Sequence, residues 1–244
     1  MRGSTLFRQV SQALFFPQSC VLCDEWILNS DFSPLCQTCL LSLEEHHQRI
    51  CSYCGIRLPG SVLEALGTCP ACRAGAPPFD FARSYGPYAG NLRTLIWKFK
   101  FEGHRRLADP LAAFLESRLS NSGLRAHSTW IVPVPAHPSR KRTRAFLLGH
   151  ALSHRIGVPV FSGLHRVKTT RPQPGLTVQE RLTNVRKAFR LCEEEQLNDR
   201  DVLIVDDVWT TGITVAEICR LLRHETPVGK IIVVTLARVS RWHP

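Results

Sequence analysis

The segment that most constrains the fold of this chain runs from residue 202 to residue 223. Its first four residues, Val202–Val205, are apolar and largely β-branched, which is typical of a buried strand of a parallel sheet. Two adjacent carboxylates, Asp206 and Asp207, follow at the carboxyl end, where open α/β sheets place their ligands. A Thr-Thr-Gly-Ile-Thr turn comes next, and residues 215–223 have the apolar spacing of a helix. The segment therefore predicts a strand, a turn and a helix that meet at a ligand site.

The residue types of this segment suit a sugar phosphate. The turn brings backbone N–H groups and three hydroxyls to the positive end of a helix, which favours a phosphate. The acidic pair is able to accept hydrogen bonds from a sugar diol. No Gly-x-x-x-x-Gly-Lys-Ser/Thr run precedes a helix, so the segment is not a P-loop. The alternative is an ordinary strand, turn and helix with an exposed acidic pair.

The segment resembles the phosphoribosyl-pyrophosphate motif of type I phosphoribosyltransferases. The resemblance implies that Asp206 and Asp207 bind the ribose 2- and 3-hydroxyls and act in catalysis. It also implies that the turn holds the 5-phosphate. The substrate-binding residues expected in this segment are Asp206, Asp207, Val208, Thr210, Thr211, Gly212, Ile213 and Thr214.

Eight of the ten cysteines form four Cys-x-x-Cys pairs near the N-terminus. A gap of two residues lets both thiolates of a pair face one metal ion, and two pairs complete a tetrahedral site that usually holds Zn²⁺. Four pairs predict two structural zinc sites. We expect the first of these pairs, or knuckles, to share a metal ion with the second, and the third with the fourth. The alternative is that the first knuckle shares a metal ion with the third. The expected ligands are Cys20, Cys23, Cys36 and Cys39 in one site, and Cys51, Cys54, Cys69 and Cys72 in the other.

Disulfides and redox chemistry are the competing interpretations of these cysteines. Disulfides need an oxidising compartment, and the N-terminal residues lack the pattern of a secretory signal. A thioredoxin-like site would use one such pair rather than four. No stretch approaches the roughly 20 apolar residues of a membrane span. We therefore expect zinc, a cytoplasmic protein and no membrane span.

The chain of 244 residues has an uneven charge distribution. Residues 1–80 hold 5 Lys and Arg against 7 Asp and Glu, a net charge of −2. Residues 81–244 hold 26 against 13, a net charge of +13. A polyanionic partner should therefore meet the larger, C-terminal part first, although this charge suits a phosphorylated sugar and a nucleic acid equally.

Periodicity places alternating helices and strands in the C-terminal part. Helices are expected over 91–100, 107–119, 145–156 and 177–189, and strands over 130–134, 158–161, 202–205 and 231–236. This alternation predicts an α/β fold with a mainly parallel sheet flanked by helices. With the Ala-Pro-Pro stretch at 76–78 as a linker, we expect a Cys-rich zinc-binding domain over 1–78 and a phosphoribosyltransferase-like domain over 79–244.

Several further segments resemble the ComF family (also called ComFC or GntX), in which a zinc-bearing head is fused to a phosphoribosyltransferase domain. They lie at residues 14–20, 95–100, 132–138, 173–176 and 188–189, so the resemblance spans nearly the whole chain. One departure stands at residues 144–148, where Arg-Ala-Phe-Leu-Leu replaces the family's Arg-Gly-Phe-Asn-Gln. Two leucines thus take the place of an amide pair.

The family fold implies that the turn after the strand at 130–134 contacts pyrophosphate. The residues expected to do so are Pro135, Ala136, His137 and Arg140, with Lys98 and Lys100 as further candidates. Lys98 and Lys100 lie two positions apart, so at most one should face the site. A solvated basic surface is the alternative for Arg140, and a loop-ordering role is the alternative for His137.

A loop over residues 166–173 is expected to close on the sugar phosphate. It would bring Lys168 and Arg171 to the leaving group as catalytic residues. Mg²⁺ is expected to arrive with the pyrophosphate, because hard cations prefer oxygen ligands.

Two functions are compatible with these features. The first is a phosphoribosyltransferase that uses phosphoribosyl pyrophosphate and Mg²⁺, linked through its family to DNA uptake or the use of imported DNA. The second is a non-catalytic competence factor that binds single-stranded DNA and works with the DNA-uptake machinery. Against the second, no aromatic residue is interleaved with the basic run at residues 140–144, as a stacking surface would need.

Overall fold

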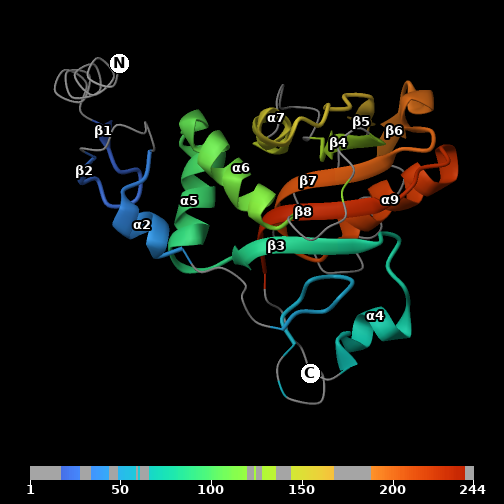
Figure 1. Cartoon of the computed structure of the whole chain (residues 1–244), viewed down its shortest axis with the longest axis horizontal. Coiled ribbons are helices and arrows are strands. Elements are labelled where there is room, and N and C mark those ends of the chain that lie inside the picture. The colour runs from blue at the N-terminus through green and yellow to red at the C-terminus, as the bar shows by residue number, and fades with distance from the viewer. Residues whose placement is uncertain are drawn as a thin grey trace, which may run out of the picture.

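The computed structural model describes residues 18–27, 34–43, 49–58, 60, 66–119, 124, 128–135, 144–167 and 188–239. Its centre is a four-stranded sheet, drawn horizontally in Figure 1. The spatial order is β3-β8-β7-β4, and every neighbouring pair is parallel. The strands are β3 (Phe81–Pro87), β4 (Thr129–Pro133), β7 (Asp201–Trp209) and β8 (Ile231–Arg238). The predicted parallel α/β fold is confirmed.

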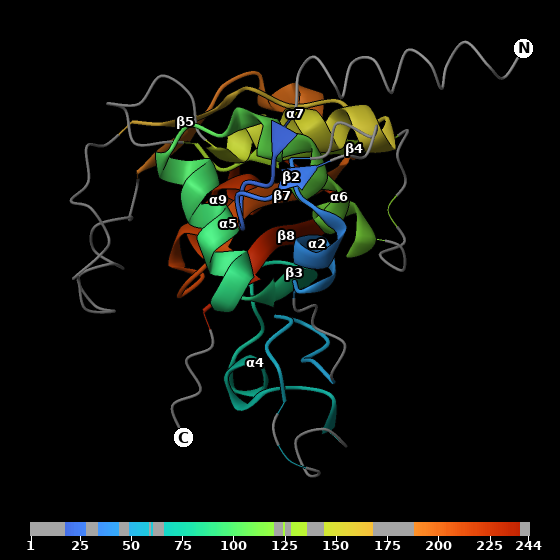
Figure 2. The same cartoon turned by 90° about the vertical axis from the view of Figure 1, so that its left-hand side faces the viewer.

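Helices cover both faces of the sheet. On one face lie α5 (Gly90–Phe101), α6 (Ala108–Ser117), which follows the short 3-10 helix η1 (Arg105–Leu107), and α7 (Arg144–Ile156). On the other lies α9 (Ile213–Glu225) (Figures 1 and 2). Alternate residues of β7 divide between them, because Val202 and Ile204 pack with α9 whereas Leu203 and Val205 pack with α5, α6 and α7.

A small antiparallel sheet lies beside α9. It consists of β5 (Leu164–Arg166) and β6 (Phe189–Leu191), followed by the 3-10 helix η3 (Glu194–Leu197). Two sequence predictions are wrong here. Arg166 belongs to β5 rather than to a loop, and Phe189 belongs to β6 rather than to the end of a helix. Phe189 is buried against the core on the α9 face, which favours strand pairing over helix. Residues 177–187 of the predicted helix over 177–189 lie outside the described residues.

Two further differences concern strands. The sequence analysis did not assign β3, whose Arg, Ser and Gly residues lack a regular apolar pattern. The strand expected over 158–161 is reduced to one bridge, between Val160 and Ile131. The predicted helices at 91–100, 107–119 and 145–156 are confirmed as α5, α6 and α7 within a few residues. Gly157 ends α7 in the left-handed region, at a φ of 67°.

The Cys-rich part divides into two pieces that contact different parts of the sheet layer. The first piece contains β1 (Gln18–Ser19), β2 (Trp26–Ile27) and α2 (Gln37–Leu41), and it lies beside α5 (Figure 1). The second contains α4 (Pro70–Ala74) and lies beside β3 (Figure 1). The boundary predicted after residue 78 falls between α4 and β3 and stays a prediction. Within the described ranges, no helix is long and apolar enough to cross a membrane.

Candidate functional site

The acidic pair lies at the edge of the sheet where its strands end. β4 stops at Pro133, which is paired with Val205, so Asp206 and Asp207 extend beyond the end of that neighbouring strand. Asp206 is still paired with Thr235 of β8. Both carboxylates are only partly exposed. The strand therefore presents two carboxylates at the carboxyl edge of the sheet, where open α/β sheets place their ligands.

A lysine from α5 reaches this pair. Nζ of Lys100 lies 2.8 Å from Oδ1 of Asp207, and the two side chains are 25% and 14% exposed. Burial lowers the pKa of Lys100, but the Asp207 and Asp206 carboxylates outweigh this effect and raise the pKa above its usual value. Lys100 is therefore a fixed positive charge. Lys98 lies about 160° away around the helix axis, so the structure brings Lys100 rather than Lys98 to the acidic pair.

Asp206 has the most strongly altered carboxyl group of the site. Burial and the neighbouring Asp207 raise its pKa from the ordinary 3.8 to about 7, although Lys100 and Arg166 act in the opposite direction. One of its oxygens accepts a hydrogen bond from the backbone N–H of Asp207 at 2.9 Å. A carboxyl group that titrates near neutral pH beside a permanent cation is typical of a functional site.

The turn after β7 leads directly into α9. Gly212 has a φ of 75°, which favours glycine, and it precedes the first helical residue, Ile213. A side chain at position 212 would also meet Trp209, because a Cβ there would lie 2.5 Å from a ring carbon. Thr210 is exposed, whereas Thr211, Ile213 and Thr214 are half-buried. The turn is thus a short connection, packed against the Trp209 ring, that leads into the N-terminus of α9, the end of a helix that favours an anion.

Two arginines near the acidic pair are not among the site residues predicted from the sequence. Arg166 of β5 is close enough to Asp206 for their charges to interact, and its guanidinium lies 5.7 Å from the ring of Phe189. Arg144, the first residue of α7, donates Nε to the carbonyl of Lys100 at 3.3 Å and lies over Phe99. Both depend on contacts between distant segments, and sequence spacing gives no signal for such contacts.

Part of the predicted pyrophosphate side lies outside the described residues. This holds for Ala136, His137, Arg140, Lys168 and Arg171. Pro135 is half-buried and follows Val134, whose N–H donates to the carbonyl of Val205 at 2.9 Å. That hydrogen bond places the start of the predicted pyrophosphate turn beside the end of the β7 core, next to the acidic pair.

The two leucines that replace the family's amide pair belong to the core. Leu148 is fully buried and Leu147 packs against the cluster that α5, α6 and α7 form with the sheet. Neither side chain is therefore available for a polar substrate contact.

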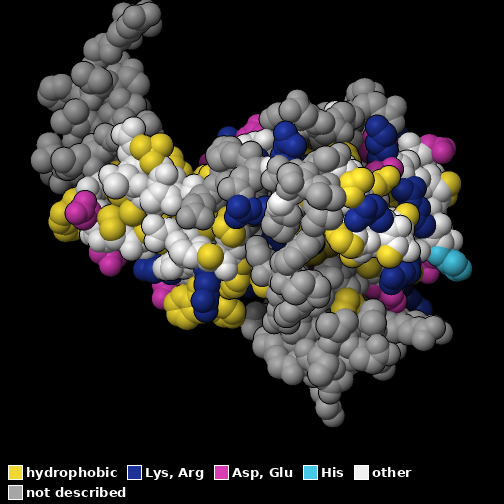
Figure 3. Space-filling view, turned by 90° about the horizontal axis from the view of Figure 1, so that it is seen from below, with side chains coloured by type: hydrophobic (Ala, Val, Ile, Leu, Met, Phe, Trp, Pro, Cys, Tyr) yellow, Lys and Arg dark blue, Asp and Glu magenta, His cyan; other side chains and the backbone are white. Residues whose placement is uncertain are grey.

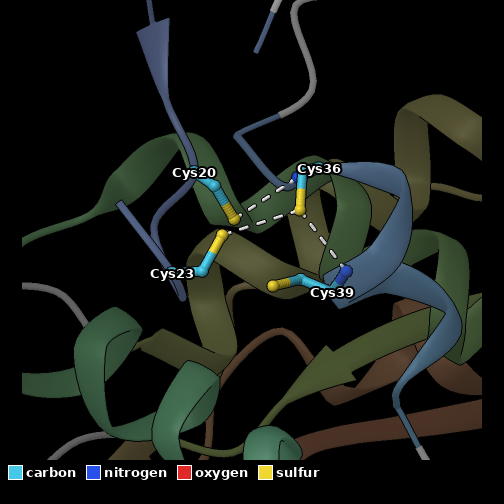
Figure 4. Close-up of side chains that lie close together, drawn as sticks. All are labelled: Cys20, Cys23, Cys36 and Cys39. Atoms are coloured by element: carbon cyan, nitrogen blue, oxygen red, sulfur yellow. Dashed lines mark hydrogen bonds between the residues drawn. The ribbon is translucent and has the colours of Figure 1, made fainter. Parts of the chain in front are cut away.

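The first cysteine cluster has the geometry of a four-thiolate metal site. Figure 4 shows the sulfur atoms of Cys20, Cys23, Cys36 and Cys39 turned toward one another, and all four lie within 4.8 Å. Sγ of Cys23 and Sγ of Cys36 are 3.7 Å apart, close to the ~3.8 Å that zinc–sulfur bonds of 2.3 Å give in a tetrahedron. Burial opposes ionisation of Cys20, but hydrogen bonds from backbone N–H groups lower its pKa to about 6. Such a thiol readily becomes a thiolate ligand.

The second cluster repeats this geometry in a more buried position. Its sulfur atoms also lie within 4.8 Å of one another, and the backbone N–H of Cys69 donates to Sγ of Cys51 at 3.4 Å. Burial again opposes ionisation of Cys51, yet backbone hydrogen bonds lower its pKa to about 7. Burial raises the pKa of Cys54 to about 11, against the effect of Arg238. The donor sets of both clusters fit zinc, and the sequential pairing Cys20/Cys23/Cys36/Cys39 and Cys51/Cys54/Cys69/Cys72 is confirmed.

The third knuckle, Cys51 to Cys54, is docked on the edge strand β3. The N–H of Ala82 donates to the carbonyl of Tyr53 at 2.6 Å, and Nη1 of Arg83 donates to the carbonyl of Ser52 at 3.0 Å. Gly55 permits this approach, because a Cβ there would lie 2.4 Å from the carbonyl oxygen of Ala82. The knuckle thereby covers part of an otherwise open sheet edge.

The two cysteines outside the clusters differ in exposure. Cys219 is buried in α9 and Cys192 is exposed.

Comparisons with known proteins match two different families to the two parts of the chain. A phosphoribosyl transferase domain matches residues 138–243, and a double zinc ribbon domain matches residues 11–73. The chain is 31% identical to Competence protein F of Haemophilus influenzae, over 92% of this chain and 98% of that protein. It is 32% identical to the DNA utilization protein YhgH of Salmonella typhimurium, over 77% of this chain and 90% of that protein. Competence protein ComFC of Bacillus subtilis is 23% identical, over 90% of this chain and 94% of that protein.

Proposed function

This chain belongs to the ComF family, and on that basis we propose that it binds phosphoribosyl pyrophosphate with Mg²⁺ and transfers the phosphoribosyl group to an acceptor. The observation that carries the proposal is the position of Lys100. Its ammonium pairs with Asp207 at the sheet edge, directly before the turn that leads into α9. A cation, two carboxylates and a helix N-terminus are the groups that a pyrophosphate, a ribose diol and a 5-phosphate require.

Each group has a distinct task in this proposal. Asp206 and Asp207 accept hydrogen bonds from the ribose hydroxyls and hold the ring, while the turn holds the 5-phosphate, through the residues Thr210, Thr211, Gly212, Ile213 and Thr214. Lys100 then exchanges its contact with Asp207 for one with the pyrophosphate. The charge of the leaving group is thereby balanced as the C1–O bond breaks.

The remaining residues of the pyrophosphate side complete the proposal. Pro135, Ala136, His137 and Arg140 contact the leaving group, with Lys98 further from it. Lys168 and Arg171 close over it in the bound state. Mg²⁺ supplies additional charge when it is bound to the pyrophosphate oxygens.

We further propose that this activity serves DNA uptake or the use of imported DNA. Two relatives are named Competence protein F and DNA utilization protein YhgH, and both align with most of this chain. The proposal places the protein in the cytoplasm, because paired zinc thiolates are stable in a reducing compartment. Its partners there are phosphoribosyl pyrophosphate, single-stranded DNA and the uptake machinery.

One observation favours the alternative of a non-catalytic factor that binds single-stranded DNA. Trp97 and Phe101 are 47% and 56% exposed and their ring centroids lie 5.8 Å apart on one face of α5. Arg93 is one turn earlier on the same face. Figure 3 shows hydrophobic side chains at the surface with Lys and Arg side chains close by. The exposed surface of the helix therefore combines aromatic and basic residues, as a stacking surface requires.

Pyrophosphate release separates the two functions. Purified protein is incubated with phosphoribosyl pyrophosphate, Mg²⁺ and, in turn, each nucleobase, nucleoside and nucleotide. Pyrophosphate release that depends on an acceptor supports transfer. If no candidate acceptor causes release although the ligand binds tightly, the result supports the non-catalytic factor. The double variant Asp206→Asn/Asp207→Asn should lose ligand binding and keep both zinc ions.

The control for this variant is Asp199→Asn. Asp199 is exposed and has a φ of 57°, a conformation that asparagine also tolerates. An unchanged affinity in the double variant would refute the proposed site.

A further inference from the structure

Arg238 joins the second cysteine cluster to the end of β7. It is the last residue of β8, and its Nη1 donates to the carbonyl of Cys54 at 2.7 Å. Its guanidinium lies over the ring of Trp209, 4.7 Å from the centroid. Arg238 and Trp209 are only 8% and 6% exposed. A buried cation over an indole ring is a strong contact, because water does not screen it.

Trp209 in turn supports the phosphate turn. Its ring lies so close to Gly212 that an added Cβ would come within 2.5 Å of it. Phe79 packs edge-on against the same ring, with 5.5 Å between the centroids. The backbone of Trp209 also accepts a hydrogen bond from the N–H of Val239, the residue after Arg238. The position of this ring therefore fixes how closely the turn approaches the sheet.

The charge of the second cluster gives Arg238 its counter-charge. A zinc ion with four thiolates carries two excess negative charges, and two guanidinium groups, those of Arg83 and Arg238, lie against this cluster. Without metal the four cysteines are no longer held together, and the loop that carries the carbonyl of Cys54 loses the tether that places it against Nη1 of Arg238. The guanidinium would then stay buried over Trp209 without this acceptor, which is unfavourable.

The first cluster provides a natural comparison. Its segment contacts the sheet layer through a hydrogen bond from Nδ2 of Asn91 to Oγ of Ser42, at the opposite end of α5 from Lys100. Cys20 and its neighbours pack in the core cluster of α5 and α6, whereas Trp209 packs in the cluster on the α9 face. Each cluster has four cysteine ligands, but the neighbours of the two clusters differ.

We propose that the metal in the second cluster, but not in the first, sets the conformation of the phosphate turn through Arg238 and Trp209. With zinc bound, Arg238 stays between the cluster and the ring, and the ring supports the turn. Without it, the turn loosens and the sugar phosphate binds more weakly. Arg238 and Trp209 are thus positioning residues. The part of this proposal that names the ligand rests on the proposed function.

Hydrogen exchange of the full chain tests the coupling without any ligand. Cys72→Ser removes a partly buried ligand of the second cluster, and Cys39→Ser removes the matching ligand of the first. Exchange of a peptide spanning residues 209–216 should be about fivefold or more faster in Cys72→Ser and should change at most twofold in Cys39→Ser. Arg238→Lys should keep both zinc ions and still exchange faster, since lysine lacks the planar group that joins both contacts. Equal exchange in the two cysteine variants would overturn the proposal.

Unmodified protein provides a second test, because coupling between two sites is reciprocal. Zinc release to a chelator is followed with and without Mg²⁺ and phosphoribosyl pyrophosphate. The ligand should slow release from the second cluster about fivefold or more and leave the first unchanged. If the ligand binds and protects neither cluster, the coupling is refuted. If it does not bind at all while the turn still exchanges faster in Cys72→Ser, the coupling stands and the proposed function falls.

Discussion

Nζ of Lys100 and Oδ1 of Asp207 are 2.8 Å apart, although 107 positions separate them in the chain. The contact joins the end of α5 to the end of β7 and places a cation at the sheet edge. Arg144 supports the contact from behind by donating to the carbonyl of Lys100. A contact of this kind between buried or partly buried charges contributes more than a solvent-exposed ion pair.

Replacing Lys100 should weaken ligand binding more than replacing Lys98. Lys100→Met removes a charge-assisted hydrogen bond worth about 1.5–3 kcal/mol, so the dissociation constant for phosphoribosyl pyrophosphate should rise at least tenfold. Lys98→Met removes the same charge from the same helix but from a different face, and its effect should be smaller. Isothermal titration calorimetry measures both. Equal losses would show that only the overall charge of α5 matters.

Binding should depend on pH through Asp206. Its pKa is raised to about 7 in the folded protein, and the ionised form is the better hydrogen-bond acceptor for a ribose hydroxyl. Affinity should therefore increase between pH 6 and pH 8, with release of a proton on binding near pH 6.5. Calorimetry in buffers of different ionisation enthalpy measures that proton. Binding without proton release at this pH would contradict the assignment.

The same carboxyl group should make the folded protein less stable as pH rises, whereas ligand affinity should increase with pH. Between its ordinary pKa of 3.8 and about 7, the unfolded chain loses this proton while the folded chain keeps it. The contribution of Asp206 to the free energy of unfolding therefore falls as pH rises through this window. Asp206→Asn should raise the melting temperature more at pH 8 than at pH 5. A gain that does not change with pH would argue against a buried, titrating Asp206.

Gly212→Ala should impair both stability and ligand binding. The substitution places a Cβ against the ring of Trp209, in a backbone conformation that already disfavours alanine. Gly157→Ala is the matched control, because its φ of 67° is similar but nothing lies within 4 Å of the added Cβ. The first should cost more than the ~1–2 kcal/mol of left-handed strain alone. Denaturant unfolding compares them, and equal costs would mean that the ring does not limit the turn.

Zinc should leave the two clusters in a defined order. Cys23 is exposed and Cys36 and Cys39 are half-buried, whereas Cys51, Cys54 and Cys69 are buried. A chelator should therefore remove two zinc ions per chain in two phases, with the first cluster released first. Cys39→Ser should abolish the fast phase and Cys72→Ser the slow one. Release in a single phase, or the reverse assignment of the phases, would contradict this order.

Single-stranded DNA binding, if it occurs on α5, should require the exposed aromatic pair. Trp97→Ala/Phe101→Ala should weaken binding of an oligonucleotide by about 1–3 kcal/mol per stacked base. Binding should also weaken steeply with salt. The control is Trp26→Ala, which removes a 67% exposed tryptophan from the negatively charged N-terminal part. Fluorescence anisotropy measures binding by the double variant, by the control variant and at increasing salt. An equal loss in the double variant and in Trp26→Ala would exclude a specific surface on α5.

The elements that the sequence predicted best are those whose signal is local. The strand with Asp206 and Asp207, the glycine turn and α9 have consecutive residues that favour the same structure, and the Cys-x-x-Cys spacing determines the metal ligands by itself. β3 was missed because its burial depends on β8, which lies 150 positions later. Phe189 was assigned to a helix because its pairing with Arg166 in β6 and β5 is likewise not local.

The site shows the same limit. The acidic pair and the turn were identified from adjacent residues, whereas sequence spacing could only say that one of Lys98 and Lys100 faces the site. The choice of Lys100 depends on how α5 crosses the sheet. Arg166, Arg144 and Arg238 reach Asp206, Lys100 and Cys54 through contacts between distant segments, so their positions required the three-dimensional arrangement.

The most direct measurement is a crystal structure of the protein grown with phosphoribosyl pyrophosphate and Mg²⁺. We predict that the 5-phosphate accepts hydrogen bonds from backbone N–H groups of residues 211–214, that the ribose hydroxyls lie within hydrogen-bond distance of Asp206 and Asp207, and that Lys100 has moved to the pyrophosphate. A ligand bound elsewhere, with the pair between Lys100 and Asp207 intact, would contradict the central claim.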